Sequence, residues 1–110
     1  MSISQDVARI GNLDVSTNLR LTNYIDDSAT TGNRTVNRVR GKNAFAIGAA
    51  AVTITNNLCF ANSQVLCSLE FIDATLTTIL TVIPAAGSFV VTGNANATAA
   101  TRFSWVVINP

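Results

Sequence analysis

The sequence contains no histidine, and this absence excludes several classes of active site. A serine or cysteine nucleophile lacks the imidazole base that commonly activates it. A zinc site of the Cys/His type cannot form within one chain. The sequence also has no Gly-x-Ser-x-Gly elbow and no glycine-rich phosphate loop. We therefore predict that the protein is not an enzyme, and we expect no metal ion and no cofactor.

Charge is also scarce. Charged residues make up 12% of the chain and hydrophobic residues 48%, with a net charge of +1 and a mean hydropathy of +0.36. An average soluble domain is about 25% charged. A single domain of this size leaves much of its surface in water, so we expect other subunits to cover part of it. The alternative is a monomer that abundant Thr, Asn and Ser keep in solution.

Long apolar runs are missing as well. The least polar stretch, residues 44–54, is well short of the ~20 residues that a membrane helix needs. The first residues lack the basic and apolar regions of a secretory signal. The sequence therefore predicts no membrane association and synthesis in the cytoplasm.

The two cysteines, Cys59 and Cys67, both have apolar neighbours. A reducing compartment favours buried free thiols at such positions. A disulfide across this short loop is the alternative, and the sequence alone does not decide between them.

The second half of the chain carries strong strand signals. Alternating or β-branched residues predict strands over 52–55, 64–72, 77–83, 88–92 and 101–109. We expect a hairpin turn over residues 84–87, where proline presets φ and glycine accepts positive φ. The expected core side chains are Phe89, Phe103, Trp105 and Val107. Spacing of about ten residues predicts an all-β, single-domain antiparallel β-sandwich, jelly-roll-like, with an N-terminal extension.

The first half is more polar, and we divide the single domain at this change. Residues 1–43 are expected to hold strands over 7–10 and 13–21 and a polar arm or loop over 26–33. Val36 and Val39 predict an edge strand that arginines protect from unwanted pairing. Residues 44–110 are expected to form the β-sandwich module.

The carboxylates do not form a promising catalytic pair. Asp26 and Asp27 are adjacent in the polar loop and predict a solvated turn. Glu70 and Asp73 follow the 64–72 strand. We expect them to act as an edge charge and a turn cap, respectively.

One segment is locally basic, because the sequence has no acid between Asp27 and Glu70. Its cations are Arg34, Arg38, Arg40 and Lys42, of which the last three are predicted to share a strand face. A solvated strand, a docking patch for an acidic protein surface and a nucleic-acid contact are the three interpretations. Nucleic acid is disfavoured because interleaved aromatics are missing and the net charge is small.

Several strand and turn motifs in the second half form a recognisable pattern: Ala51–Asn56, Asp73–Leu76, Val82–Phe89, Asn96–Thr98 and Trp105–Asn109. This pattern resembles a β-sandwich module of tailed-bacteriophage virion proteins, of the head decoration (cement) type. The resemblance covers about residues 44–110. Its motifs are strands and turns without chemistry, so they indicate a scaffold more than a role.

The resemblance implies a capsid decoration protein that binds and stabilises the major capsid shell as a dimer or trimer on the virion exterior. The alternative is a fibre-tip or spike module that binds a host receptor or carbohydrate. The short N-terminal extension favours decoration, since a fibre shaft does not fit in 43 residues. The expected capsid contacts are the N-terminal segment and Arg34, Arg38, Arg40 and Lys42, with the loop 93–100 facing outward.

Overall fold

Alternation of buried and exposed side chains governs the long strands of this protein, as the sequence pattern requires. The computed structural model describes residues 22–110, so the strands expected over 7–10 and 13–21 lie outside the described residues. The strands are β1 (Tyr24–Asp26), β2 (Arg34–Thr35), β3 (Arg40–Phe45), β4 (Ala51–Thr55), β5 (Gln64–Leu69), β6 (Ile79–Ala85), β7 (Ser88–Gly93) and β8 (Thr101–Ile108).

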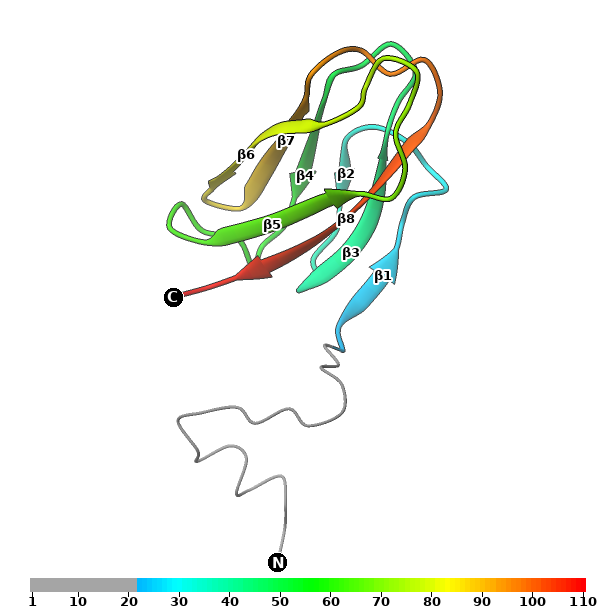
Figure 1. The fold of residues 1–110 in the computed structure, drawn as a ribbon. Coiled ribbons are helices and arrows are strands. Elements are labelled where there is room, and N and C mark those ends of the chain that lie inside the picture. The colour runs from blue at the N-terminus through cyan, green and yellow to red at the C-terminus, as the bar shows by residue number, and fades with distance from the viewer. Residues whose placement is uncertain (1–21) are drawn as a thin grey trace, which may run out of the picture.

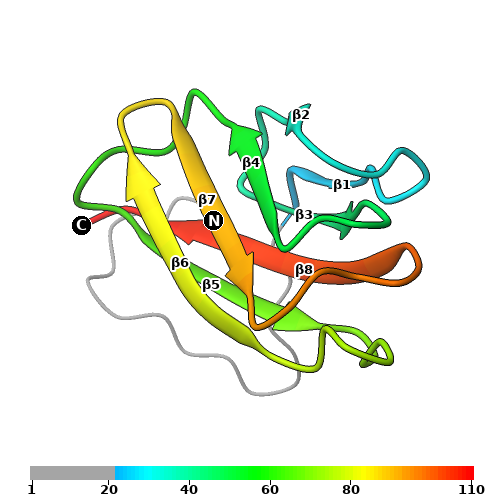
Figure 2. The ribbon, with the colours of Figure 1, turned by 90° about the horizontal axis from the view of Figure 1, so that it is seen from above.

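The strands form two four-stranded sheets that pack as two layers (Figures 1 and 2). Sheet A has the order β1-β3-β8-β5, and sheet B has the order β2-β4-β7-β6. This arrangement confirms the all-β sandwich. Most neighbouring strands are antiparallel, as expected, but β1 pairs with β3 and β2 pairs with β4 in parallel. Among residues 22–110, no helix is long and apolar enough to cross a bilayer.

The core lies between the two sheets. Phe89 of sheet B meets the Trp105 ring of sheet A edge-on, with the ring centroids 5.1 Å apart. Phe45 and Phe103 pack at the same centroid distance of 5.1 Å. Each of the four aromatic side chains is at most 3% exposed. The core positions expected from β7 and β8 are therefore confirmed.

Two strand ends differ from the expectation. β5 stops at Leu69, before the expected end at residue 72, and Phe71 is 44% exposed because it lies beyond the strand. β6 runs through Pro84, which pairs with Phe89, so the turn begins only at Ala86. Proline is tolerated there because β6 is an edge strand, where a missing N–H can face solvent.

The polar first half takes part in both sheets. The division expected between residues 43 and 44 falls inside β3, which pairs with β8 along its length. The single edge strand expected around Val36 and Val39 is wrong. The chain leaves β2 in sheet B, buries Val36 in the core at 5% exposure, and crosses to sheet A before β3 begins.

Asp73 joins the loop between β5 and β6 to the loop between β7 and β8. Both loops lie at the upper end of the molecule in Figure 1. The Asp73 carboxylate accepts hydrogen bonds from the backbone N–H and the hydroxyl of Thr98, at 2.9 and 2.7 Å. It also accepts from the backbone N–H groups of Thr75 and Leu76. The expected turn cap is thus confirmed, and it ties the β5–β6 loop to the β7–β8 loop. In the latter loop, Ala97 is buried at 3% exposure and anchors it to the core.

Candidate functional site

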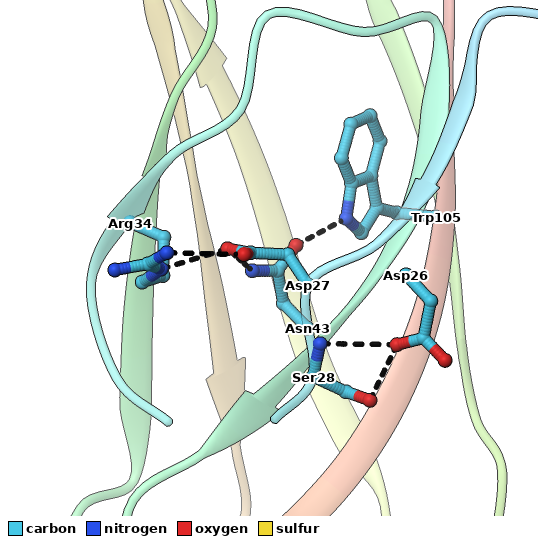
Figure 3. A network of polar contacts seen from close by, with 6 residues as sticks. All are labelled: Asp26, Asp27, Ser28, Arg34, Asn43 and Trp105. Atoms are coloured by element: carbon cyan, nitrogen blue, oxygen red, sulfur yellow. Dashed lines mark hydrogen bonds and ion pairs between the residues drawn. The ribbon is translucent and has the colours of Figure 1, made fainter. Parts of the chain in front are cut away.

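A buried amide organises the polar side chains between the sheets. Asn43 points inward from β3 and has no exposed surface. Its Oδ1 accepts a hydrogen bond from Trp105 Nε1 at 2.9 Å, and its Nδ2 donates to Asp27 Oδ2 at 3.2 Å (Figure 3). The buried amide of Asn43 therefore supplies hydrogen-bond partners to the Trp105 N–H and to the Asp27 carboxylate, as buried polar groups require.

Arg34 completes this network from the other sheet. Its Nε and a terminal nitrogen donate to the two oxygens of Asp27, at 2.7 and 3.0 Å (Figure 3). This forked contact lowers the pKa of Asp27, chiefly through the hydrogen bond from Arg34, and raises the pKa of Arg34. The pair fastens the loop between β1 and β2, and Arg34 is held in this contact although 38% of its side chain is exposed.

The solvated turn expected of Asp26 and Asp27 is wrong for Asp27, which Arg34 holds in a partly buried ion pair, but it describes the preceding residue, Asp26, at the end of β1. Asp26 accepts hydrogen bonds from the backbone N–H and the hydroxyl of Ser28 (Figure 3). The hydroxyl bond is the main cause of its lowered pKa. Asp26 is exposed, whereas its neighbour Asp27 is partly buried beside Arg34. The two carboxylates therefore serve separate structural contacts.

The outer surface of sheet A brings cationic and apolar side chains together. Strand register places Tyr24, Arg40, Val106 and Leu66 in one row across the sheet. The Arg40 guanidinium lies 4.5 Å from the centroid of the Tyr24 ring. Tyr24 is 38% exposed and Leu66 49%, so the row offers apolar contact area to a partner. We call this outer surface the sheet A face.

The sheet A face continues into a small ion cluster. Lys42 Nζ lies 3.1 Å from Glu70 Oε1, and Arg102 Nε lies 3.8 Å from the other oxygen of Glu70. The Glu70 hydrogen bond raises the pKa of Lys42. The Arg102 guanidinium also lies 5.6 Å from the centroid of the Phe71 ring. Asp26 lies opposite Lys42 in the strand register, and both Lys42 and Arg102 lower its pKa. Two cations therefore meet two carboxylates at this end, and the positive charge of the face rests mainly on Arg40.

A hollow of about 290 Å³ lies on the same face. It is lined by Arg40, Leu66, Cys67, Ser68, Ser104, Trp105 and Val106. The lining joins one cation to apolar and hydroxyl groups. Such a surface suits contact with a protein side chain more than it suits a reaction.

The four cations expected at the site are divided by the fold. Arg40 and Lys42 lie side by side on the sheet A face, as predicted from their spacing. Arg38 is exposed but lies in the bend before β3, so it does not share their strand face. Arg34 belongs to sheet B and contacts Asp27.

Other residues of this face come from strands distant in sequence: Tyr24, Leu66, Arg102 and Val106. Arg102 and Val106 lie at outward positions of the alternating pattern in β8. This pattern is the only sign in the sequence that they belong to the outer surface. Their place beside Arg40 depends on strand register, which the sequence pattern does not reveal.

The reactive groups among residues 22–110 do not assemble into a metal or nucleophile site. Within that range, no three His, Cys, Asp or Glu side chains lie close enough to hold a metal ion. Cys59 and Cys67 are free thiols. Burial raises the pKa of Cys67 to about 12, so its thiol stays protonated near neutral pH.

The described geometry thus offers one mixed cationic and apolar surface as the candidate site. No protein-family model, no curated protein and no solved structure matches this chain significantly.

Proposed function

We propose that the protein is a bacteriophage capsid decoration protein. It binds the major capsid protein on the exterior of the virion and stabilises the assembled shell as a small oligomer. The observation that carries the proposal is the sheet A face. There Arg40 and Lys42 project from β3 on the same side of the sheet as the exposed side chains of Tyr24 and Leu66. The resemblance of residues 44–110 to phage virion modules supplies the partner.

The chemistry of this face suits a protein partner. Tyrosine and arginine are enriched in protein interfaces, whereas lysine and acids are depleted at their centres. The Tyr24 ring stacks against the Arg40 guanidinium and restricts its motion before binding, which reduces the entropy lost on contact. An acidic patch on the shell, flanked by apolar side chains, would complement this surface.

Stabilisation follows from selective binding. A partner that binds the assembled shell, but not its separated subunits, favours assembly by mass action. Several copies held in one oligomer bind with higher avidity than one copy. No reaction is required, so the function fits a chain without histidine.

Co-sedimentation with empty, expanded shells tests the proposal. The variant Arg40→Glu should reduce the bound fraction at least about tenfold, since a like charge replaces an attractive one at the contact. Asn57→Glu/Asn62→Glu is the control, because it adds negative charge at exposed positions of the β4–β5 loop. Thermal unfolding of each variant checks that the fold is intact.

Two outcomes would contradict decoration. Unchanged shell binding by the Arg40→Glu variant would remove the sheet A face from the contact. Selective binding of one sugar on a glycan array, without shell binding, would instead favour the fibre-tip or spike module that the resemblance leaves open.

A further inference from the structure

The outer surface of sheet B differs in kind from the sheet A face. Its outward side chains come from β4, β6 and β7, and we call them together the sheet B face: Ala51, Thr53, Thr55, Thr81, Ile83, Ala85, Ser88, Val90 and Thr92. None of the residues 51–55, 79–85 and 88–93 carries a charge. Leu80, at a register shift beside this face, is 61% exposed, and Ile83 is 59% exposed.

Strand register makes this face an ordered surface. Ile83, Val90 and Thr53 form one row across three strands, with Val90 on the middle strand. Branched side chains of this type have one strongly preferred χ1 rotamer in many settings. They therefore lose little side-chain entropy when another surface covers them.

The charge distribution indicates what covers the face. Among residues 22–110, every charged side chain lies outside β4, β6 and β7. The nearest cation is Arg34 of the neighbouring edge strand β2, which lines a hollow with Thr53 and Thr55 and is paired with Asp27. An acidic protein or a nucleic acid would therefore find little counter-charge here. In a two-fold contact, a residue near the axis lies beside its own copy, so a charge at the centre of the contact faces a like charge. A neutral face avoids that repulsion, and this favours a second copy of the same chain.

The geometry of β6 indicates how the copies meet. β6 is an edge strand, and edge strands are a common route for extending a sheet between chains. Pro84 lacks an N–H, and the register shifts between Ile79 and Thr81. Both features oppose edge-to-edge pairing along β6. At this end of sheet B, the copies are therefore expected to meet through their faces rather than along β6.

We propose that two copies associate by packing their sheet B faces together across a two-fold axis, with Val90 near the axis. The two sheet A faces of the pair then point in opposite directions. If the decoration proposal holds, on which this clause rests, each dimer bridges two shell subunits that flank it. Self-association itself requires no shell and is tested separately.

The size of the face sets the expected strength. Three strands about 5 Å apart, each about 20 Å long, give a flat area of roughly 300 Å² per copy. Standard interfaces bury about 800 Å² per partner. We therefore expect a weak dimer, with a Kd of roughly micromolar or higher, that the high local concentration on a shell would populate.

Sedimentation velocity of the full chain from about 5 µM to about 500 µM tests the dimer. The wild type should shift from monomer towards dimer. Val90→Lys should weaken dimerisation about tenfold or more, because it places two ammonium groups near the axis. Val106→Lys is the matched control: it makes the same substitution at a half-buried, outward position of a central strand in sheet A. It should leave dimerisation unchanged.

A monomer throughout that range, a trimer, or weakening by Val106→Lys but not by Val90→Lys would overturn the inference. Thermal unfolding checks each variant. If Val90→Lys does not fold, Thr53→Lys in the same row replaces it with the same expectation. Shell binding without dimers overturns this inference alone, whereas dimers that ignore shells overturn the decoration proposal alone.

Discussion

The indole Nε1 of Trp105 donates to the side-chain oxygen of Asn43 at 2.9 Å, which joins the two central strands of sheet A inside the core. Both residues are at most 3% exposed, so water cannot replace either partner. Asn43 also donates to Asp27, and Asp27 is bound by Arg34 of sheet B. This one buried amide thus connects the core to the loop that links the two sheets.

Asn43→Ala should lower the free energy of unfolding by about 2–4 kcal/mol, since it leaves a buried N–H unpaired and opens a small cavity. Urea unfolding measures the change. Asn62→Ala, at an exposed position, should change it by less than about 0.5 kcal/mol. In the double variant Asn43→Ala/Trp105→Phe the loss should fall short of the sum by about 1 kcal/mol. Additive losses would mean that the hydrogen bond does not couple the two residues.

Gly41→Ala should destabilise the protein by about 1–3 kcal/mol through overpacking. An added Cβ would lie 2.8 Å from the backbone oxygen of Ile25 and 2.9 Å from Trp105 Cζ2. The three-residue edge strand β1 offers the easiest relief. Hydrogen exchange should therefore quicken at the β1 amides, as mass spectrometry can detect.

Gly48→Ala provides the control for this effect. A Cβ at position 48 meets nothing within 4 Å, but φ there is +82°. Backbone strain should cost about 1–2 kcal/mol without loosening β1. Equal exchange at β1 in the Gly41 and Gly48 variants would contradict the close approach.

Acid should weaken the Asp73 clamp. Hydrogen bonds, first of all from the Thr98 backbone N–H, hold the pKa of Asp73 well below its ordinary value of 3.8. The folded state therefore gains stability when the carboxylate is ionised, and this gain is lost as the pH falls below about 4. The stability difference between wild type and Asp73→Asn should be largest near pH 6 and shrink towards pH 2. Thermal unfolding across that range measures it.

Asp26→Asn serves as the comparison, because Asp26 also has a lowered pKa but makes a turn within its own loop. Only the Asp73 variant should increase hydrogen exchange in both the β5–β6 and β7–β8 loops. A difference between wild type and Asp73→Asn that stays constant with pH would exclude the clamp.

The thiols of the folded protein should react slowly with a disulfide reagent at pH 8. Burial holds the pKa of Cys67 at about 12, and Cys59 is 1% exposed. Unfolding in urea should release both for rapid reaction. Each thiol that reacts releases one thiolate from the reagent, and the absorbance of that thiolate measures how many thiols have reacted. Rapid reaction of the folded protein at either thiol would show that the core opens readily.

Strict alternation made much of the sandwich predictable. In β7 and β8, apolar residues recur at every second position, and a glycine-containing turn precedes β7. Pro84 was harder, because proline is tolerated only when its strand lies at an edge. Edge position depends on the pairing of distant strands, which local pattern does not contain.

The candidate site was less predictable for the same reason. The spacing of Arg40 and Lys42 was enough to place them on one face. Whether a cation is available for binding depends on its partners: Arg34 is held by Asp27, since the chain crosses between sheets at that point. Tyr24 and Leu66 join Arg40 through strand register, and their own local sequence gives no sign of it.

The alternation of β3 has a consequence for the fidelity of folding. Gly41, Asn43 and Phe45 face the core, while Arg40 and Lys42 face out. A shift of one residue against β8 would exchange the two sets and bury both cations. An unpaired buried charge costs several kcal/mol. A sheet with the shifted register should therefore be much less stable than the native sheet. The alternation in β3 thus selects the native register during folding.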